Sequence, residues 1–216
     1  MPEPISDAPP PFVGFDPASI SPRESYKLLT SGIAPRPIAL VSTVSEGGQP
    51  NLAPFSFFMA GGYHPPSLAF APAAGRDGQP KDTLRNIRET GEFTVSVVSY
   101  ALREPMNLAS SSLGPGESEW DLAGLTPIAG VKVRPARAEE SLMAMECRLH
   151  QIVRHGDGPE AAHYVIGEVV YFHVATSLIG EGGEIDPARL DSVARLGGDW
   201  YARAGGDALF TMTRPG

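Results

Sequence analysis

The stretch that decides the fold is "RPIALVSTVSEGGQPNLAPFSFF", residues 36–58. Residues 36–44 form a dense run of β-branched and apolar side chains, residues 45–50 are typical of a turn, and residues 51–58 interleave aromatic with small residues. This pattern predicts two strands joined as a hairpin. Pro54 interrupts the second strand. Because proline has no backbone N–H, its position must be a sheet edge, a bulge, or a place where something other than a strand approaches the backbone.

Strand patterns continue beyond this hairpin. Apolar runs predict further strands within 65–72, 92–99, 131–137, 142–156 and 162–175. Alternation along the segment 142–156 places Cys147 on the core face and Glu146 on the opposite face. Strands linked mainly by hairpins favour a closed or partly open antiparallel barrel over a parallel doubly wound sheet, which needs longer helices between its strands.

Short helices interrupt the strands, and the fold class is therefore mainly β with short α insertions. The expected helices are 22–30, 83–90, 103–112 and 187–196. The first begins with a capping box formed by Ser21 and Glu24. Asp82 and Asp186 are the expected N-caps of the second and the last. Residues 113–130 are rich in Gly and Pro and are expected to form a long loop.

Composition limits the functions that the chain can have. Its 216 residues are 42% hydrophobic, which suits one large domain with a sizeable core. The formal charge of −8 argues against nucleic acid and anionic membranes as partners, because both need a positive protein surface. Cys147 is the single cysteine, so no internal disulfide forms. Residues 1–15 lack signal-peptide features and no segment approaches about 20 apolar residues, so we expect a cytoplasmic protein.

The start of the expected helix 83–90 is a candidate phosphate site. Its free backbone N–H groups would be joined by the charge of Lys81 and the hydroxyl of Thr83. A capped surface helix with a solvated lysine explains the same residues, and both interpretations stay open. Arg36 is a second candidate donor, or an ordinary charge at the rim of the sheet. Neither of the two common glycine-rich phosphate loops occurs in the sequence.

Metal and nucleophilic chemistry have less support. The histidines lack the spacing of a helical or strand metal clamp, so no metal site is predicted. No G-x-S-x-G motif occurs, and Cys147 falls on the apolar side of its strand, where it is expected to be core.

The strand around Pro54 suits a flat heteroaromatic ligand such as a flavin. A flavin needs apolar contacts on its faces and backbone or small polar groups along its edge, which requires backbone that is not fully used by a ladder. Asn51, Pro54 and Ser56 would leave such backbone available. A bulged edge strand explains the same residues, so this alternative stays open as well.

Five segments, taken in order, carry a family resemblance. "APRPIALVST", "NLAPFSFF", "PKDTLRNI", "GEFTVSVV" and "HYVIGEVV" resemble the flavin reductase-like, FMN-binding split-barrel family, which includes the reductase components of two-component flavin monooxygenases. The similarity spans about residues 26–175, and "RLGGDWYAR" resembles the C-terminal element of that family.

The resemblance implies a homodimeric, antiparallel Greek-key split β-barrel that binds FMN, or FAD as in some relatives, near the subunit interface. It divides the chain into a Pro-rich arm at 1–21, a flavin reductase-like domain at 22–175, and a C-terminal helix and tail at 176–216 that packs on the barrel or on the partner subunit. The implied cofactor-binding residues are Arg36, Ser42, Asn51, Ala53, Pro54, Phe55 and Ser56 around the flavin and Lys81, Asp82 and Thr83 at its phosphate. His163 is implied as the catalytic residue beside the nicotinamide, and Arg195 with Tyr201 as residues that close over the site.

The implied function is that of an NAD(P)H:flavin oxidoreductase. Hydride would pass from NAD(P)H to flavin N5, and the reduced flavin would serve a partner monooxygenase or pass electrons onward. Because the protein would mainly hold two rings in contact, no acid–base pair is expected. Two alternatives stay open: an FMN-binding electron carrier or sensor without NAD(P)H turnover, and a split-barrel protein that binds another phosphate-bearing cofactor.

Overall fold

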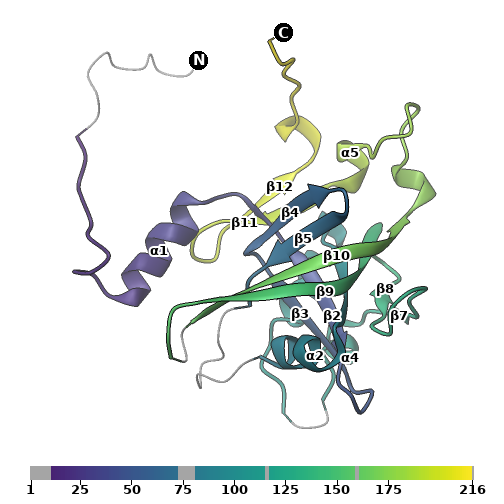
Figure 1. The fold of residues 1–216 in the computed structure, drawn as a ribbon. Coiled ribbons are helices and arrows are strands. Elements are labelled where there is room, and N and C mark those ends of the chain that lie inside the picture. The colour runs from purple at the N-terminus through teal and green to yellow at the C-terminus, as the bar shows by residue number, and fades with distance from the viewer. Residues whose placement is uncertain (1–10, 73–80, 115–116, 159–160, 216) are drawn as a thin grey trace.

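A seven-stranded antiparallel sheet organises the chain (Figure 1). The computed structural model describes residues 11–72, 81–114, 117–158 and 161–215. The strand order within these residues is β3-β2-β6-β9-β10-β5-β4. In chain order, the strands of this sheet are β2 (Ala39–Val44), β3 (Pro50–Phe55), β4 (Phe58–Tyr63), β5 (Pro66–Phe70), β6 (Glu92–Val97), β9 (Met143–His155) and β10 (Ala162–Val174).

The two edge strands of this sheet, β3 and β4, follow each other in the chain. Only Ser56 and Phe57 separate them. A sheet whose edges are joined by two residues has to curl until the edges approach each other, so it closes into a barrel with a seam between β3 and β4. Pro54 lies on β3, opposite Leu40 of β2. Since an edge strand has no partner on one side, proline fits there, and of the three positions expected for Pro54 the structure shows the edge.

Smaller elements surround the barrel. β1 (Arg36–Pro37), β11 (Ser192–Arg195) and β12 (Tyr201–Ala204) form a second sheet, and β7 (Pro127–Ile128) pairs with β8 (Arg137–Ala138). The helices are α1 (Pro22–Gly32), α2 (Asp82–Thr90), α3 (Arg103–Leu108), α4 (Glu119–Ala123) and α5 (Pro187–Leu190), with 3-10 helices η1 (Tyr100–Leu102), η2 (Thr176–Leu178) and η3 (Gly206–Ala208). In Figure 1, α1 lies on the side toward which the long β9–β10 hairpin extends. Among the described residues, no helix has the length and hydrophobicity needed to cross a bilayer.

Two apolar clusters lie on either side of β2. The barrel interior is filled around Phe93, and Ile87 of α2 joins this cluster. On the other side, Leu40 packs in one cluster with Met106 of α3 and Trp120 of α4. Both faces of β2 are therefore buried, which explains why its sequence is continuously apolar rather than alternating. Trp120 also shows that part of the expected loop 113–130 contributes to the core.

Most of the predicted elements are confirmed. β2 and β3 form the predicted hairpin, and α1 begins with the predicted capping box of Ser21 and Glu24. Within the predicted ranges lie β5, β6, β9, β10 and a shorter α3, while α2 begins one residue before its predicted start. Cys147 is fully buried as expected, and this burial raises the pKa of its thiol. The separate strand β4 was not expected, because residues 51–58 were assigned to one strand.

The predicted strand at 131–137 is wrong, because a buried carboxylate takes its backbone donors. Only the two-residue strand β8 forms at the end of this segment. Three consecutive N–H groups donate to the carboxylate of Glu146, at 2.7, 2.5 and 3.0 Å, from Val131, Lys132 and Val133. These donors are therefore not available to a strand ladder.

Glu146 is itself a correction to the sequence pattern. Its position on the face opposite Cys147 was expected to be outside the core, but the side chain is fully buried. His173 Nε2 lies 2.6 Å from Oε1 of Glu146. Burial alone would raise the pKa of Glu146, but its hydrogen bonds to the backbone and to His173 outweigh burial and lower the pKa.

The predicted helix at 187–196 is too long. Its N-cap is confirmed, since Asp186 accepts a hydrogen bond from the N–H of Ala188 at 2.8 Å. The helix ends at Leu190, however, because Asp191 adopts the left-handed conformation with φ of 47°. The chain then continues as β11, and the N–H of Val193 donates to the carbonyl of Val98 at 3.0 Å.

Candidate functional site

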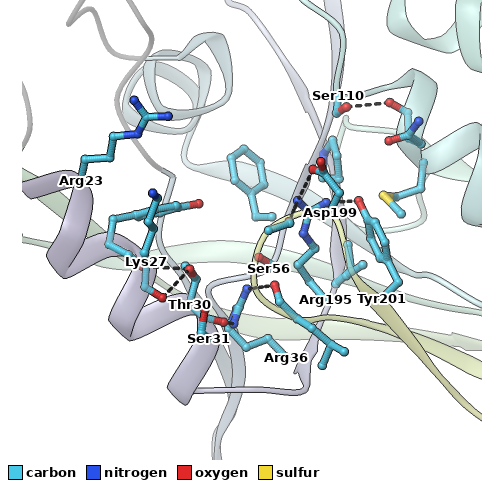
Figure 2. A pocket seen from close by; sticks show the side chains of 18 residues that line it. Arg23, Lys27, Thr30, Ser31, Arg36, Ser56, Ser110, Arg195, Asp199 and Tyr201 are labelled. Atoms are coloured by element: carbon cyan, nitrogen blue, oxygen red, sulfur yellow. Dashed lines mark hydrogen bonds and ion pairs between the residues drawn. The ribbon is translucent and has the colours of Figure 1, made fainter. Parts of the chain in front are cut away.

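A cavity of about 420 Å³ opens beside the seam (Figure 2). It lies where α1, the end of β3, α3 and the turn between β11 and β12 meet, and we call it the first cavity. Six of the predicted site residues line it: Arg36, Pro54, Phe55, Ser56, Arg195 and Tyr201. The seam thus opens the edge of β3 to a space that is not filled by another strand, which is the property that a ring-shaped ligand requires.

Arg36 connects the walls of this cavity. It is 7% exposed, and Nη1 donates to the carbonyl of Thr30 at 2.6 Å and to that of Ile33, both from the C-terminal end of α1. Nη2 donates to the carbonyl of Leu196, in the turn between β11 and β12, at 3.0 Å. No acceptor for its buried Nε occurs among the described residues. Burial lowers the pKa of Arg36, but a guanidinium stays charged in proteins.

The first cavity is strongly cationic for a protein with a net charge of −8. Arg23 and Lys27 approach it from α1, in addition to Arg36 and Arg195, whereas Asp199 is the single carboxylate residue that lines it among the described residues. Figure 2 shows Arg23 and Lys27 on the helix to one side and Arg195 with Asp199 on the turn to the other. Such a local excess of positive charge favours an anionic ligand.

The side chain of Arg195 is held in place by its own turn. Its Cζ lies 4.5 Å from the ring centroid of Tyr201, and Nη1 donates to the hydroxyl of that residue. Nη2 donates to the carbonyl of Gly198 and lies 3.6 Å from Oδ1 of Asp199. The predicted pair of Arg195 and Tyr201 is therefore brought together at the wall of the cavity.

A second group of predicted residues lies at the start of α2. Asn51 Nδ2 donates to the hydroxyl of Thr83 at 3.0 Å and to that of Thr43 at 3.3 Å. Asn86 Nδ2 also donates to Thr43, at 3.1 Å. Because Asn51 and Thr83 are both buried, their side chains attach the first turn of α2 to the hairpin.

Lys81, not Asp82, is the N-cap of α2, and it has no side-chain capping bond. The predicted cap Asp82 is the first helical residue and instead pairs with Arg85 at 2.8 Å. Lys81 Nζ lies 5.5 Å from the ring centroid of Phe55, which also lines the first cavity. Lys81 is an exposed residue, but partial desolvation of its ammonium group lowers its pKa. The helix N-terminus thus lies next to the cavity wall, with backbone N–H groups that no side chain of the described residues caps.

Three predicted residues belong neither to the lining of the first cavity nor to the group at the start of α2. Ser42 is buried, and no described residue bonds its hydroxyl. Ala53 is half-buried against the apolar cluster of the barrel interior. His163 lies on β10 opposite Arg154 of β9, and burial together with the charges of Arg88 and Arg154 lowers its pKa. None of these three lines the cavity.

Sequence reasoning missed the contribution of α1 and α3. Arg23 and Lys27 are four residues apart on α1, so they lie on the same helical face. That spacing in the sequence indicates a cationic helical face, although it does not show which surface the helix covers. Met106, Asn107 and Ser110 come from α3 and the residues after it, and only the fold brings them to the cavity.

Comparison with known proteins decides the family. Residues 31–185 match the family described as "Flavin reductase like domain". The chain belongs to the flavin reductase-like family. An uncharacterized protein of Halalkalibacterium halodurans is 40% identical over 203 residues, which cover 93% of this chain and 96% of that protein. The family resemblance carried by the five sequence segments is therefore confirmed.

Solved structures of similar fold include flavin-related enzymes. Nitrilotriacetate monooxygenase component B from Bacillus cereus aligns with a TM-score of 0.87 and 34% identity, over 94% of this chain and 100% of that one. The 2-nitrobenzoate 2-nitroreductase of Pseudomonas fluorescens aligns with a TM-score of 0.81 and 29% identity, over 94% and 96%. The mainly β architecture predicted from the sequence is thus that of a flavin reductase-like protein.

Proposed function

We propose that this protein is an NAD(P)H-dependent flavin oxidoreductase that binds FMN beside the seam of its barrel. The observation that carries the proposal is the cationic first cavity, which is lined by Pro54 and Phe55 of the edge strand β3 and by the next residue, Ser56. Membership of the flavin reductase-like family supports a flavin as the ligand. An apolar barrel edge next to a cluster of cations fits a ring that carries a phosphate.

The residues present fit the two ends of FMN. The isoalloxazine ring would lie against Phe55, with the backbone around Pro54 and Ser56 along its edge. The phosphate would bind at the start of α2, where Lys81 supplies a charge and the first backbone N–H groups have no side-chain cap. Asn51 and Thr83 would keep this helix at a fixed distance from β3, since their side chains bond each other.

The chain would act mainly by positioning. When bound, the flavin would supply the redox chemistry by accepting a hydride from a reduced nicotinamide. Phe55 and the end of β3 would orient the flavin ring, while Arg36 would hold α1 and the β11–β12 turn at the cavity walls. Such positioning does not require a catalytic acid or base. His163 does not line the first cavity of the single chain, and its role beside the nicotinamide stays a prediction.

A steady-state assay tests the proposal directly. The purified protein is mixed with FMN and either NADH or NADPH, and oxidation is followed by the loss of nicotinamide absorbance. We expect oxidation that depends on both the protein and the flavin. A rate no greater than that of flavin and nicotinamide alone would refute the proposal. FMN that stays bound through gel filtration without any NAD(P)H oxidation would instead support the carrier alternative.

The comparisons suggest two uses for the electrons. The Bacillus cereus structure is named as component B of a monooxygenase. If this protein has a comparable role, it would deliver reduced flavin to a partner monooxygenase. The Pseudomonas fluorescens structure is named as a nitroreductase. If this protein has a comparable role, it would reduce a small organic acceptor at the cavity itself. Release of reduced FMN into solution, measured by trapping with an unrelated flavin-binding protein, separates the two.

We also propose that the protein forms a homodimer. An apolar surface that shares no residue with the lining of the first cavity is formed on β4, β5, β9 and β10. Its residues include Met59, Val153 and Tyr164. All three of these side chains are exposed, and an apolar surface of this kind favours association with another copy. The molar mass in solution, measured by light scattering, tests this.

A further inference from the structure

A second cavity, of about 510 Å³, adjoins the first. Five residues line both cavities, so the two share one wall: Met106, Asn107, Arg195, Asp199 and Tyr201. The far side of the second cavity is formed by the start of α3 and by β12, with Arg103 and Arg203. The positive charge of the first cavity thus continues through Arg195 into a second space.

The total charge around the two cavities exceeds what one flavin phosphate needs. Six of the chain's 17 Lys and Arg residues line them, against the two carboxylates of Glu104 and Asp199. The phosphate of FMN has its own proposed site at the start of α2, where Lys81 lies. The cations on the shared wall and in the second cavity are therefore left for a different anion.

Arg103 and Arg203 of the second cavity lie over the ring of Tyr100, and each keeps one guanidinium nitrogen without an acceptor among the described residues. The Cζ atoms of Arg103 and Arg203 each lie 4.2 Å from the ring centroid of Tyr100. Arg103 donates through Nη1 to the carbonyl of Tyr100 at 2.9 Å, and its Nε lies 3.6 Å from Glu104. Arg203 donates through Nε and Nη2 to Asp191. Within the part of the chain that the structure describes, Nη2 of Arg103 and Nη1 of Arg203 have no acceptor.

The rest of the lining is apolar or aromatic. Val193 and Ala202 of the small sheet and Met106 of α3 provide apolar surface, and Tyr201 adds a ring next to Arg195. A space with apolar walls, ring faces and guanidinium edges matches a purine base joined to phosphates, since a base stacks on rings or guanidinium planes while arginine donors bind phosphate oxygens.

We propose that the second cavity binds the adenosine diphosphate group of a dinucleotide, with its pyrophosphate at the shared wall beside Arg195 and Arg103. This rests on the proposed function, because the rest of the dinucleotide then reaches the flavin site in the first cavity. Two dinucleotides carry this group, NAD(P)H and FAD. The pyrophosphate position would let either one extend from the second cavity into the first.

The test uses ADP-ribose, which has the adenosine diphosphate group but neither a nicotinamide nor a flavin. Binding to the full-length protein is measured by calorimetry. We expect Arg103→Gln to weaken binding by about tenfold or more, because hydrogen bonds to a charged group are lost. Glu104→Gln should tighten binding a few-fold, since it removes a negative charge beside the pyrophosphate. Opposite effects from neighbouring residues cannot come from general damage to the fold.

Arg134→Gln is the matched control. Arg134 is an exposed arginine paired with Glu92 at 3.3 Å, and it lines neither cavity, so ADP-ribose affinity should stay as in the unmodified protein. Absence of ADP-ribose binding at millimolar concentration would overturn the proposal. So would equal weakening by Arg103→Gln and Arg134→Gln, because the effect would then reflect net charge rather than a site.

Two further measurements identify which dinucleotide is bound and separate this proposal from the flavin proposal. A higher KM for NAD(P)H with unchanged kcat in Arg103→Gln identifies the nicotinamide dinucleotide, whereas weaker FAD binding with unchanged FMN binding identifies FAD. FMN titration without nucleotide tests the flavin site alone. ADP-ribose binding without FMN binding would leave the second cavity established and the proposed function refuted.

Discussion

Arg36→Lys separates two roles that a cation at the first cavity can have. Lysine keeps the positive charge, but its single ammonium group cannot reach three carbonyls in the way that the guanidinium reaches Thr30, Ile33 and Leu196. If Arg36 mainly connects α1 to the β11–β12 turn, the substitution should destabilise the protein. If Arg36 mainly attracts an anionic ligand to the first cavity by charge, stability should change little.

The magnitude follows from the bonds that are lost. We expect lysine to keep one of the three hydrogen bonds, and bonds to a charged group contribute about 1.5–3 kcal/mol each. Because water can replace part of the lost bonding at the carbonyls, we expect a loss of about 2–4 kcal/mol. For a chain of this size that corresponds to a fall in Tm of about 4–16 °C.

Thermal unfolding without flavin, followed by circular dichroism, measures this fall. Arg134→Lys is the control, because Arg134 is exposed and bonds the single carboxylate of Glu92. FMN affinity is measured in parallel below the unfolding temperature. An unchanged Tm for Arg36→Lys, together with a large loss of FMN affinity, would refute the role of Arg36 as a connector.

Three other predictions follow from single contacts. Lys81→Ala should weaken FMN binding about tenfold without lowering stability, as measured by titration of FMN fluorescence, because one phosphate contact is lost. Gly167→Ala should destabilise by about 1–3 kcal/mol in a denaturant titration, since its new Cβ would lie 2.3 Å from Cζ of the buried Phe93, whereas Gly47→Ala meets nothing closer than 3.7 Å and should be neutral. Glu146→Gln should destabilise by about 2–4 kcal/mol at pH 7. Folding lowers the pKa of Glu146 below its unfolded value of about 4.3, so the ionised carboxylate stabilises the fold above that pH. This stabilisation is lost as the pH falls through the lower pKa of the folded state. The difference in unfolding free energy between Glu146→Gln and the unmodified protein should therefore decrease in acid.

The local sequence was sufficient to predict an element wherever that element is determined by residues close to one another in the chain. The β2–β3 hairpin, the capping box of α1 and the stop of α2 at Gly91 all depend on neighbouring residues, and each is confirmed. One missing N–H limited Pro54 to three kinds of position, and the observed edge is one of them. These features required no knowledge of what packs against them.

The errors arise where a distant residue decides the structure. The segment 131–137 reads as a strand, but Glu146 takes three of its N–H groups, and no pattern within the segment reveals that. The predicted helix at 187–196 stops early because Asp191 turns the chain so that Val193 can bond Val98. In both cases tertiary hydrogen bonds outweigh local preference.

The candidate site divides in the same way. The family motifs located the residues of β3 and of the start of α2, which are local, but not the cations of α1, which reach the cavity only because Arg36 ties the end of α1 to the β11–β12 turn. That tie joins segments 160 residues apart in the chain. An acidic protein can therefore present a cationic cavity without a basic stretch in its sequence, because the fold gathers single cations from α1, β1, α3, β11 and β12 around one seam. The net charge then excludes general binding to polyanions, while the cavities remain selective for small ones.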